Sequence, residues 1–106
     1  MSIYRLALTT VAKRVDADRL ATVLVKKKLA ACVQVLGPVR SFYYWKKKFC
    51  RDREFILLIK TKQSLVKVLE QELHRIHPYE LPEMVVMPLS GGSKKYLHWL
   101  GSGLKS

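Results

Sequence analysis

Acidic residues and long apolar runs are scarce in this sequence. Its 106 residues contain 8 Asp and Glu against 20 Lys and Arg, which gives a formal charge of +12. The longest apolar stretches, such as 55–59, are far shorter than the roughly 20 residues that span a bilayer, and no charged-then-apolar leader opens the chain. We therefore expect a soluble, cytoplasmic protein without membrane contact, whose basic surface attracts phosphates or nucleic acid without sequence preference.

Cysteine is also rare, because only Cys32 and Cys50 occur. A single bridge would not make a disulfide framework, and the lack of a CxxC or Cys/His cluster argues against structural zinc. We expect reduced thiols and no metal requirement for folding. Since 49% of the residues are apolar, the chain can bury a core as one domain over residues 1–106.

Hydrophobic periodicity and β-branched content predict four strands. One of them, 54–61, carries five consecutive apolar residues, so we expect it to be buried on both faces. The charged stretch 46–48 predicts a turn that joins two strands in a long hairpin. The strands are expected over 3–9, 30–36 continued by 41–45 after Gly37-Pro38, 54–61, and 83–87.

Helical spacing of apolar residues predicts three helices. The first begins near Asp16 and ends in the lysines 26–28, a charge order that the helix dipole favours. The second has its N-cap at Ser64 and is ended by Pro78. The third covers 93–100, and we expect a frayed tail from Gly101.

The order strand, helix, strand, strand, helix, strand, then an added helix, is typical of one fold class. It predicts an α+β, ferredoxin-like split βαβ arrangement, in which two helices cover one face of an antiparallel sheet. The other face of that sheet has no cover in the chain. A second copy of the chain is the simplest partner for its apolar side chains.

Several functions known for this fold class can be tested against the residues. An RNA-recognition module would carry several aromatic rings on the strand 55–59, which has one. An acylphosphatase-like enzyme would need a glycine in the loop 10–14, which has none. No Ser/His/Asp order or Cys/His neighbourhood is evident, so we expect no enzyme. Glu80 and Glu83 lie close to His77 and could hold a cation or be solvated turn residues.

Five motifs in order resemble the CutA family, which is named for divalent-cation tolerance: LAACV at 29–33, SFYYW at 41–45, LIKT at 58–61, HPYELPE at 77–83 and YLHWL at 96–100. The resemblance covers nearly the whole chain. It implies a ferredoxin-like protomer in a tight homotrimer, with the three sheets facing one another. It also implies a link to copper and heavy-metal response, a structural likeness to the trimeric PII signalling proteins, and no defined catalytic activity.

The resemblance assigns candidate residues to two roles. For copper or another divalent metal the candidate ligands are His77, Cys32 and Glu83, since imidazole and thiolate suit such ions. The alternative for His77 is a cap of the second helix, and for Cys32 a small buried side chain. The candidates for the cleft between subunits are Trp45, Tyr43, Lys60, Thr61 and Tyr79; the aromatic ones could equally anchor subunit contacts, and Lys60 and Thr61 could bind an anion or cap the second helix.

This sequence departs from the family at the turn after Trp45. Relatives commonly have an acidic residue and then glycine there, so Lys47 must accept strain on the order of 1 kcal/mol or a different turn. Thr9, Thr10 and Ile76 stand where some relatives have a cysteine and a second histidine. The extra lysines predict either a naturally basic member or a redesigned surface. Two alternative functions follow: a stable trimeric scaffold or engineered assembly component, and a non-specific polyanion or nucleic-acid binder.

Overall fold

The structure, a computed structural model, describes residues 2–106 and has the predicted α+β, ferredoxin-like architecture. Four strands form one antiparallel sheet in the order β2-β3-β1-β4. Along the chain the elements are β1 (Tyr4–Val11), α1 (Arg14–Lys26), β2 (Cys32–Trp45), β3 (Lys48–Lys62), the short 3-10 helix η1 (Gln63–Leu65), α2 (Val66–Ile76), β4 (Val85–Pro88) and α3 (Lys94–Ser102).

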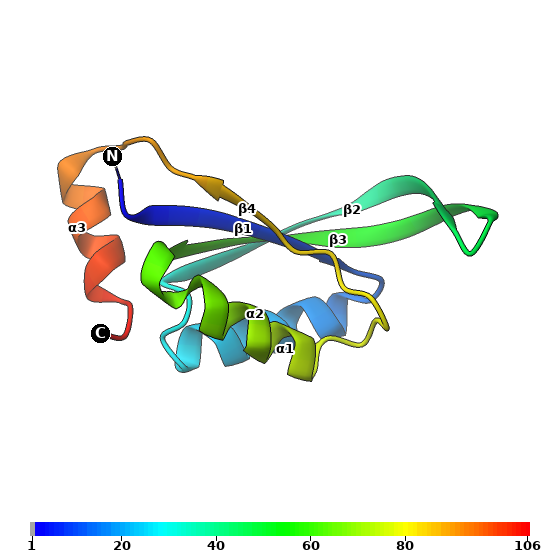
Figure 1. Ribbon diagram of the computed structural model, residues 1–106, viewed down its shortest axis with the longest axis horizontal. Helices are drawn as coiled ribbons and strands as arrows, with labels where there is room; N and C mark the ends of the chain where they lie inside the picture. The colour runs from blue at the N-terminus through cyan, green and yellow to red at the C-terminus, as the bar shows by residue number, and fades with distance from the viewer. Residues whose placement is uncertain (1) are drawn as a thin grey trace.

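The two long helices cover one face of the sheet (Figure 1). Their apolar stripes meet alternate residues of the central strands, because side chains of a strand point to opposite faces in turn. Leu20 of α1 and Leu73 of α2 are fully buried against Leu57 and Ile59 of β3. Each buried aliphatic side chain contributes about 1.5–3 kcal/mol, so burial in this layer is a large stabilising contribution.

The opposite face of the sheet has no cover within the chain. Leu8 and Leu58 pair across β1 and β3, and Ile56 pairs with Leu36 across β3 and β2. Leu36 remains 54% exposed and Val85 of β4 48% exposed. The expectation that 54–61 is buried on both faces was therefore wrong for a single chain, because both helices lie on the other side of the sheet.

The β2–β3 hairpin extends well beyond the rest of the sheet (Figure 1). Trp45 pairs with Lys48, so the turn consists of Lys46 and Lys47 alone. Both have left-handed backbone angles, with φ of 52° and 65°. A two-residue hairpin turn with two positive φ values normally uses Asn-Gly, since a Cβ makes this conformation unfavourable. Of the two alternatives predicted for Lys47, the structure therefore has the unfavourable left-handed conformation, and Lys46 shares it.

Other boundaries differ from the sequence prediction. Ser64 lies inside η1 and caps no helix, because Lys62 and Leu65 hold the N-cap positions of η1 and α2. The strands on either side of Gly37-Pro38 form one strand, whose register shifts between Leu36 and Val39. The last strand starts later than predicted, at Val85.

The C-terminal tail is ordered, contrary to the expected fraying. The helix α3 is capped by the side chain of Ser93, which accepts a hydrogen bond from the backbone N–H of Tyr96. Beyond the helix, Leu104 is buried in the core, and the N–H of Lys105 donates to the carbonyl of Lys28. Burial of one leucine and one backbone bond is enough to fix this segment on the end of α1.

The strained turn predicts a stabilising substitution. Lys47→Gly removes the Cβ from a residue with φ of 65°, and we expect it to raise the free energy of unfolding by about 0.5–1 kcal/mol. Urea unfolding followed by circular dichroism measures the change. Lys48→Gly is the matched control: its backbone is an ordinary strand, so glycine there should destabilise by about 0.5–1 kcal/mol. Equal effects at the two positions would contradict the strain.

Candidate functional site

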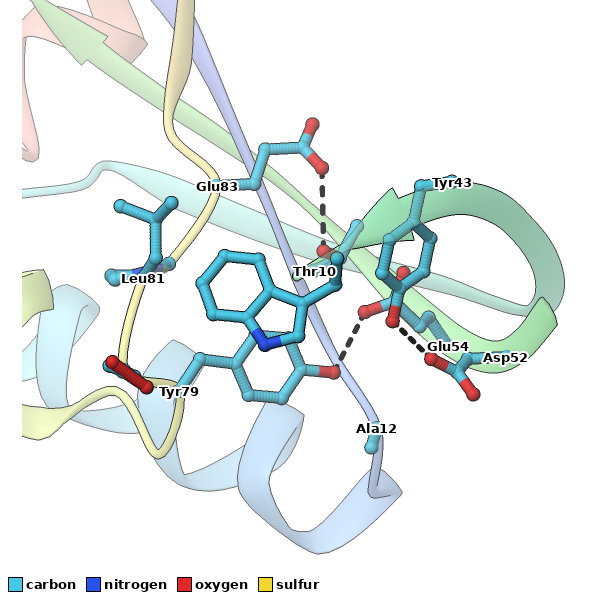
Figure 2. Close-up of a pocket in the computed structure, with 11 residues that line it drawn as sticks. Thr10, Ala12, Tyr43, Asp52, Glu54, Tyr79, Leu81 and Glu83 are labelled. Atoms are coloured by element: carbon cyan, nitrogen blue, oxygen red, sulfur yellow. Dashed lines mark hydrogen bonds between the residues drawn. The ribbon is translucent and has the colours of Figure 1, made fainter. Parts of the chain in front are cut away.

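A groove of about 780 Å³ lies at the base of the hairpin, beside the end of β1. The segment between α2 and β4 forms its other wall (Figure 2). The prolines at 78 and 82 limit the backbone of this segment and hold it away from helical geometry. The groove is lined by Thr10, Ala12, Tyr43, Trp45, Asp52, Glu54, Tyr79, Glu80, Leu81, Pro82 and Glu83.

Two phenol groups in the groove are fixed by carboxylates. The hydroxyl of Tyr79 donates to Oε2 of Glu54 at 2.7 Å, and the hydroxyl of Tyr43 donates to Oδ2 of Asp52 (Figure 2). The hydrogen bond to Asp52, with burial and the nearby negative charge, raises the pKa of Tyr43 to about 12. The pKa of Tyr79 is also raised, mainly by burial and to a smaller extent by the hydrogen bond to Glu54. Both rings are therefore neutral donors at physiological pH.

The groove is acidic in a strongly basic chain. Four of the 8 carboxylates of the sequence line it: Asp52, Glu54, Glu80 and Glu83. Glu80 forms an ion pair with Lys46 at 3.6 Å, and Glu83 accepts a hydrogen bond from the hydroxyl of Thr10 at 3.4 Å. Within residues 2–106, the other three carboxylates form no ion pair. Their negative charge therefore acts on the space of the groove with little compensation.

His77 lies behind the groove wall and is 8% exposed. Its Nδ1 accepts a hydrogen bond from the N–H of Tyr79 at 3.1 Å, so the proton of the neutral ring is on Nε2, which donates to the carbonyl of Thr10 at 2.9 Å. The ring also packs edge-on against the ring of Tyr79, with centroids 4.8 Å apart. Both nitrogens are occupied, and His77 connects the end of α2 to β1.

The remaining candidates lie at the other end of the sheet. Cys32 pairs with Lys60 of β3, whereas Thr10 pairs with Ile56 of the same strand. These two positions of β3 are four residues apart, which separates Cys32 from Thr10 by about 13 Å along the strand direction. The ammonium of Lys60 donates to the hydroxyl of Tyr96 at 3.0 Å. The buried hydroxyl of Thr61 donates to the carbonyl of Leu29 at 2.7 Å. Of the predicted cleft residues, Tyr43, Trp45 and Tyr79 share the groove, whereas Lys60 and Thr61 do not.

The predicted metal ligands were tested against this geometry. Cys32 is distant from Thr10, which both His77 and Glu83 contact, and both ring nitrogens of His77 are engaged in hydrogen bonds. Within residues 2–106, no three His, Cys, Asp or Glu side chains are grouped to hold a metal ion. The three residues do not fit one metal site within a single chain, so a metal site built from them would need another subunit.

Sequence reasoning missed Asp52 and Glu54 as site residues. The signal was present in the alternation of the stretch RDRE at 51–54, which places these two carboxylates on one face of a strand. The two-residue turn then sets Asp52 opposite Ser41 and Cys50 opposite Tyr43. Because residues paired across a hairpin share a face, this register places Asp52 and Glu54 on the face that carries Tyr43 and Trp45.

The geometry defines a class of protein: a ferredoxin-like α+β domain with a projecting hairpin and a groove at its base. A family profile described as "CutA1 divalent ion tolerance protein" matches residues 5–103. The chain belongs to the CutA family, as its motifs predicted. None of the helices described in residues 2–106 is long and apolar enough to cross a membrane.

Relatives from bacteria and plants agree with this assignment. "Divalent-cation tolerance protein CutA" of Pectobacterium atrosepticum is 44% identical over 84% of this chain and 81% of its own length. "Protein CutA, chloroplastic" of Arabidopsis thaliana is 40% identical over 92% of this chain, which spans only 53% of that protein. The CutA structure from Xylella fastidiosa superposes with a TM-score of 0.94 at 35% identity, over 98% of this chain and all of that one. The chain thus spans about half the length of several plant and animal relatives.

The buried histidine predicts a dependence of stability on pH. Burial lowers the pKa of His77 below its usual value near 6.5, although the bond to Thr10 opposes this. As the pH falls below about 6.5, His77 takes up a proton in the unfolded chain but not yet in the folded chain. The contribution of His77 to the free energy of unfolding is therefore complete above that pH and is lost progressively below it.

His77→Gln tests this expectation, because the glutamine amide can still donate to Thr10 but does not titrate. We expect the wild-type chain to lose more stability than the variant between pH 7.5 and pH 5, as measured by urea unfolding at each pH. Parallel losses in the two proteins would show that His77 titrates normally in the folded state.

Proposed function

We propose that this chain is a non-catalytic CutA protein that acts in divalent-cation tolerance as a homotrimer. Family membership supports the link to cations, because the relatives are named for cation tolerance and not for a reaction. The observation that carries the assembly is the uncovered sheet face. A cytoplasmic location remains a prediction.

The uncovered face has the properties of a subunit interface. It is formed by the paired side chains of all four strands, and its centre is apolar: Leu6, Leu8, Leu36, Ile56, Leu58, Val85 and Met87. Leu36, Val85 and Met87 are 54%, 48% and 39% exposed in the single chain. A contiguous apolar surface of this kind is rare on monomers, and its burial against other copies would stabilise them at about 25 cal/mol per Å².

The assembly makes a direct prediction about mass. We expect the wild-type protein to sediment at three times the chain mass at micromolar concentration. Leu36→Asp places a carboxylate on the apolar face, where its burial without a partner in the trimer costs several kcal/mol, and should give monomers. Analytical ultracentrifugation distinguishes the two states.

Val15→Asp is the matched control for this experiment. Val15 is 69% exposed in the first turn of α1, on the helix side of the sheet, so the same chemical change there should leave the trimer intact. A monomeric wild-type protein, or equal dissociation of both variants, would contradict assembly through the uncovered face.

The link to cations does not require a tight metal site in one chain. The predicted ligands do not converge, and His77 would have to give up a hydrogen bond before it could bind a metal. We infer that the role of His77 is structural. Neither the scaffold nor the polyanion alternative gains support from the comparisons.

Metal titration tests this inference. We expect isothermal titration of the assembled protein with Cu(II) or Zn(II) to give the same affinity in the wild-type protein and in His77→Gln, since both ring nitrogens serve the fold. Cys32→Ser and Glu83→Gln are measured in parallel. A loss of tenfold or more in both His77→Gln and Cys32→Ser would show that the two residues share a metal site between subunits.

A further inference from the structure

The helix side of the β2–β3 hairpin has no part in the function proposed above. Where the hairpin extends beyond α1 and α2, neither helix covers it (Figure 1). We propose that this side binds single-stranded nucleic acid, with aromatic rings that stack on bases and arginines that contact phosphates. We call it the arm face, and its side chains are Arg40, Phe42, Tyr44, Phe49, Arg51 and Arg53. The role in cation tolerance does not enter the argument.

The arm face lies on the opposite side of the hairpin from the groove. Side chains alternate between the two faces of a strand, and Phe55, which is buried in the core with the helices, identifies the helix side. Arg53, Arg51 and Phe49 follow Phe55 at every second residue of β3. Their partners on β2 are Arg40, Phe42 and Tyr44. The uncovered sheet face carries the other set of alternate residues, so the arm face is not part of the apolar surface through which copies are proposed to associate.

Three large aromatic rings are exposed together on the arm face. Phe42 is 54% exposed, Tyr44 74% and Phe49 59%. The ring of Phe49 contacts both of the others, with centroids 5.6 Å from Tyr44 and 6.4 Å from Phe42. Clusters of exposed apolar side chains mark interaction sites on soluble proteins. Rings of this kind stack on bases of any sequence, because every base has a π-face.

The arginines of the arm face are a second, independent observation. Arg40 and Arg53 pair directly across the two strands, and Arg51 is two residues from Arg53 on the same face. Like charges directly opposite each other destabilise a sheet, and within residues 2–106 no carboxylate forms an ion pair with any of the three. A bound polyanion would remove this repulsion. The guanidinium group suits phosphate, because it presents a planar fork of donors with a permanent charge.

Acidic side chains are absent from the arm face. The two acids between residues 40 and 55, Asp52 and Glu54, belong to the other side, where they accept hydrogen bonds from Tyr43 and Tyr79. The rings lie toward the tip of the hairpin and the guanidinium groups toward the helices. From residue 55 to residue 49 the strand spans roughly 20 Å. This length suits several nucleotides, since one strand of a stacked helix has a phosphate about every 3.4 Å.

A single strand matches this face better than a duplex does. Bases in a duplex are stacked and paired, so their faces are not available to protein rings, whereas single strands present them. The strand 55–59, on which an RNA-recognition module would carry its rings, has only Phe55, and that ring is buried. Binding therefore uses the hairpin and leaves the sheet to the contacts between copies.

Fluorescence anisotropy of a labelled oligonucleotide tests the proposal. At low salt we expect the protein to bind oligothymidylate of about 15 nucleotides at least fivefold more tightly than an abasic oligonucleotide of the same length and charge, because only the first can stack on the rings. Oligouridylate of equal length should bind within about threefold of oligothymidylate, since neither stacking nor phosphate contact involves the 2′-hydroxyl.

Ring-removing variants locate the stacking contact. Tyr44→Ser and Phe49→Ser should each weaken the binding of oligothymidylate by about fivefold or more, with little change in the binding of the abasic oligonucleotide. Trp99→Ser is the matched control, because it removes an exposed ring from α3, outside the arm face, and should change the affinity by less than about twofold. Phe42→Ser repeats the measurement at the third ring, so a folding defect in one variant leaves the readout intact.

Charge-removing variants locate the phosphate contact. Arg51→Gln should reduce the slope of log K against log [NaCl] by about 0.7, the value for one phosphate contact of a single strand. Arg19→Gln, at an exposed position of α1, makes the same change of charge outside the arm face and should leave the slope unchanged.

Three results would overturn the proposal. One is equal affinity for oligothymidylate and the abasic oligonucleotide, which would reduce the binding to general surface charge. Another is an equal effect of Tyr44→Ser and Trp99→Ser, which would place the contact outside the arm face. The third is a lower oligomeric state of Phe42→Ser and Phe49→Ser than of the wild-type protein in analytical ultracentrifugation, which would assign the rings to contacts between copies. The first two results leave the sedimentation and metal titration experiments unaffected, so the two proposals fail separately.

Discussion

The register of the β2–β3 hairpin is the constraint on which the rest of the structure depends. A turn of two residues leaves no freedom in the pairing: Tyr43 lies opposite Cys50, and Asp52 lies opposite Ser41. A slip of one residue would turn every side chain of a strand to the other face. It would then expose Leu57 and Ile59, which the helices bury, and move the carboxylates out of the groove. The strain at Lys46 and Lys47 is small beside that loss.

The arrangement of the elements could be predicted from the sequence because it depends on long periodic patterns. The leucines of α1 and α2 recur at helical spacing and are buried as expected. Local capping was less predictable: Ser64 has the chemistry of an N-cap, yet a 3-10 turn places it inside the helical segment. The order of the tail depends on the burial of Leu104, a tertiary contact that no local pattern contains.

The candidate site could be predicted only in part, for a related reason. The resemblance identified Tyr43, Trp45, Tyr79 and Glu83, all of which line the groove. It also drew attention to Cys32, which the sheet places at the far end of the molecule. Asp52 and Glu54 lie in a run of alternating charge that is also typical of a solvated strand, and only the paired register shows that they face Tyr43 and Tyr79. Composition could not predict this site, because a net charge of +12 for the whole chain does not show that carboxylates are locally in excess.

Thr10 holds both ends of the segment that forms the outer wall of the groove. Its carbonyl accepts from His77 at the start of the segment, and its hydroxyl donates to Glu83 near the end. A stretch with two prolines, tied at both ends to one residue of a central strand, has few alternative conformations. The wall therefore moves with the sheet as one body and does not open and close as a lid.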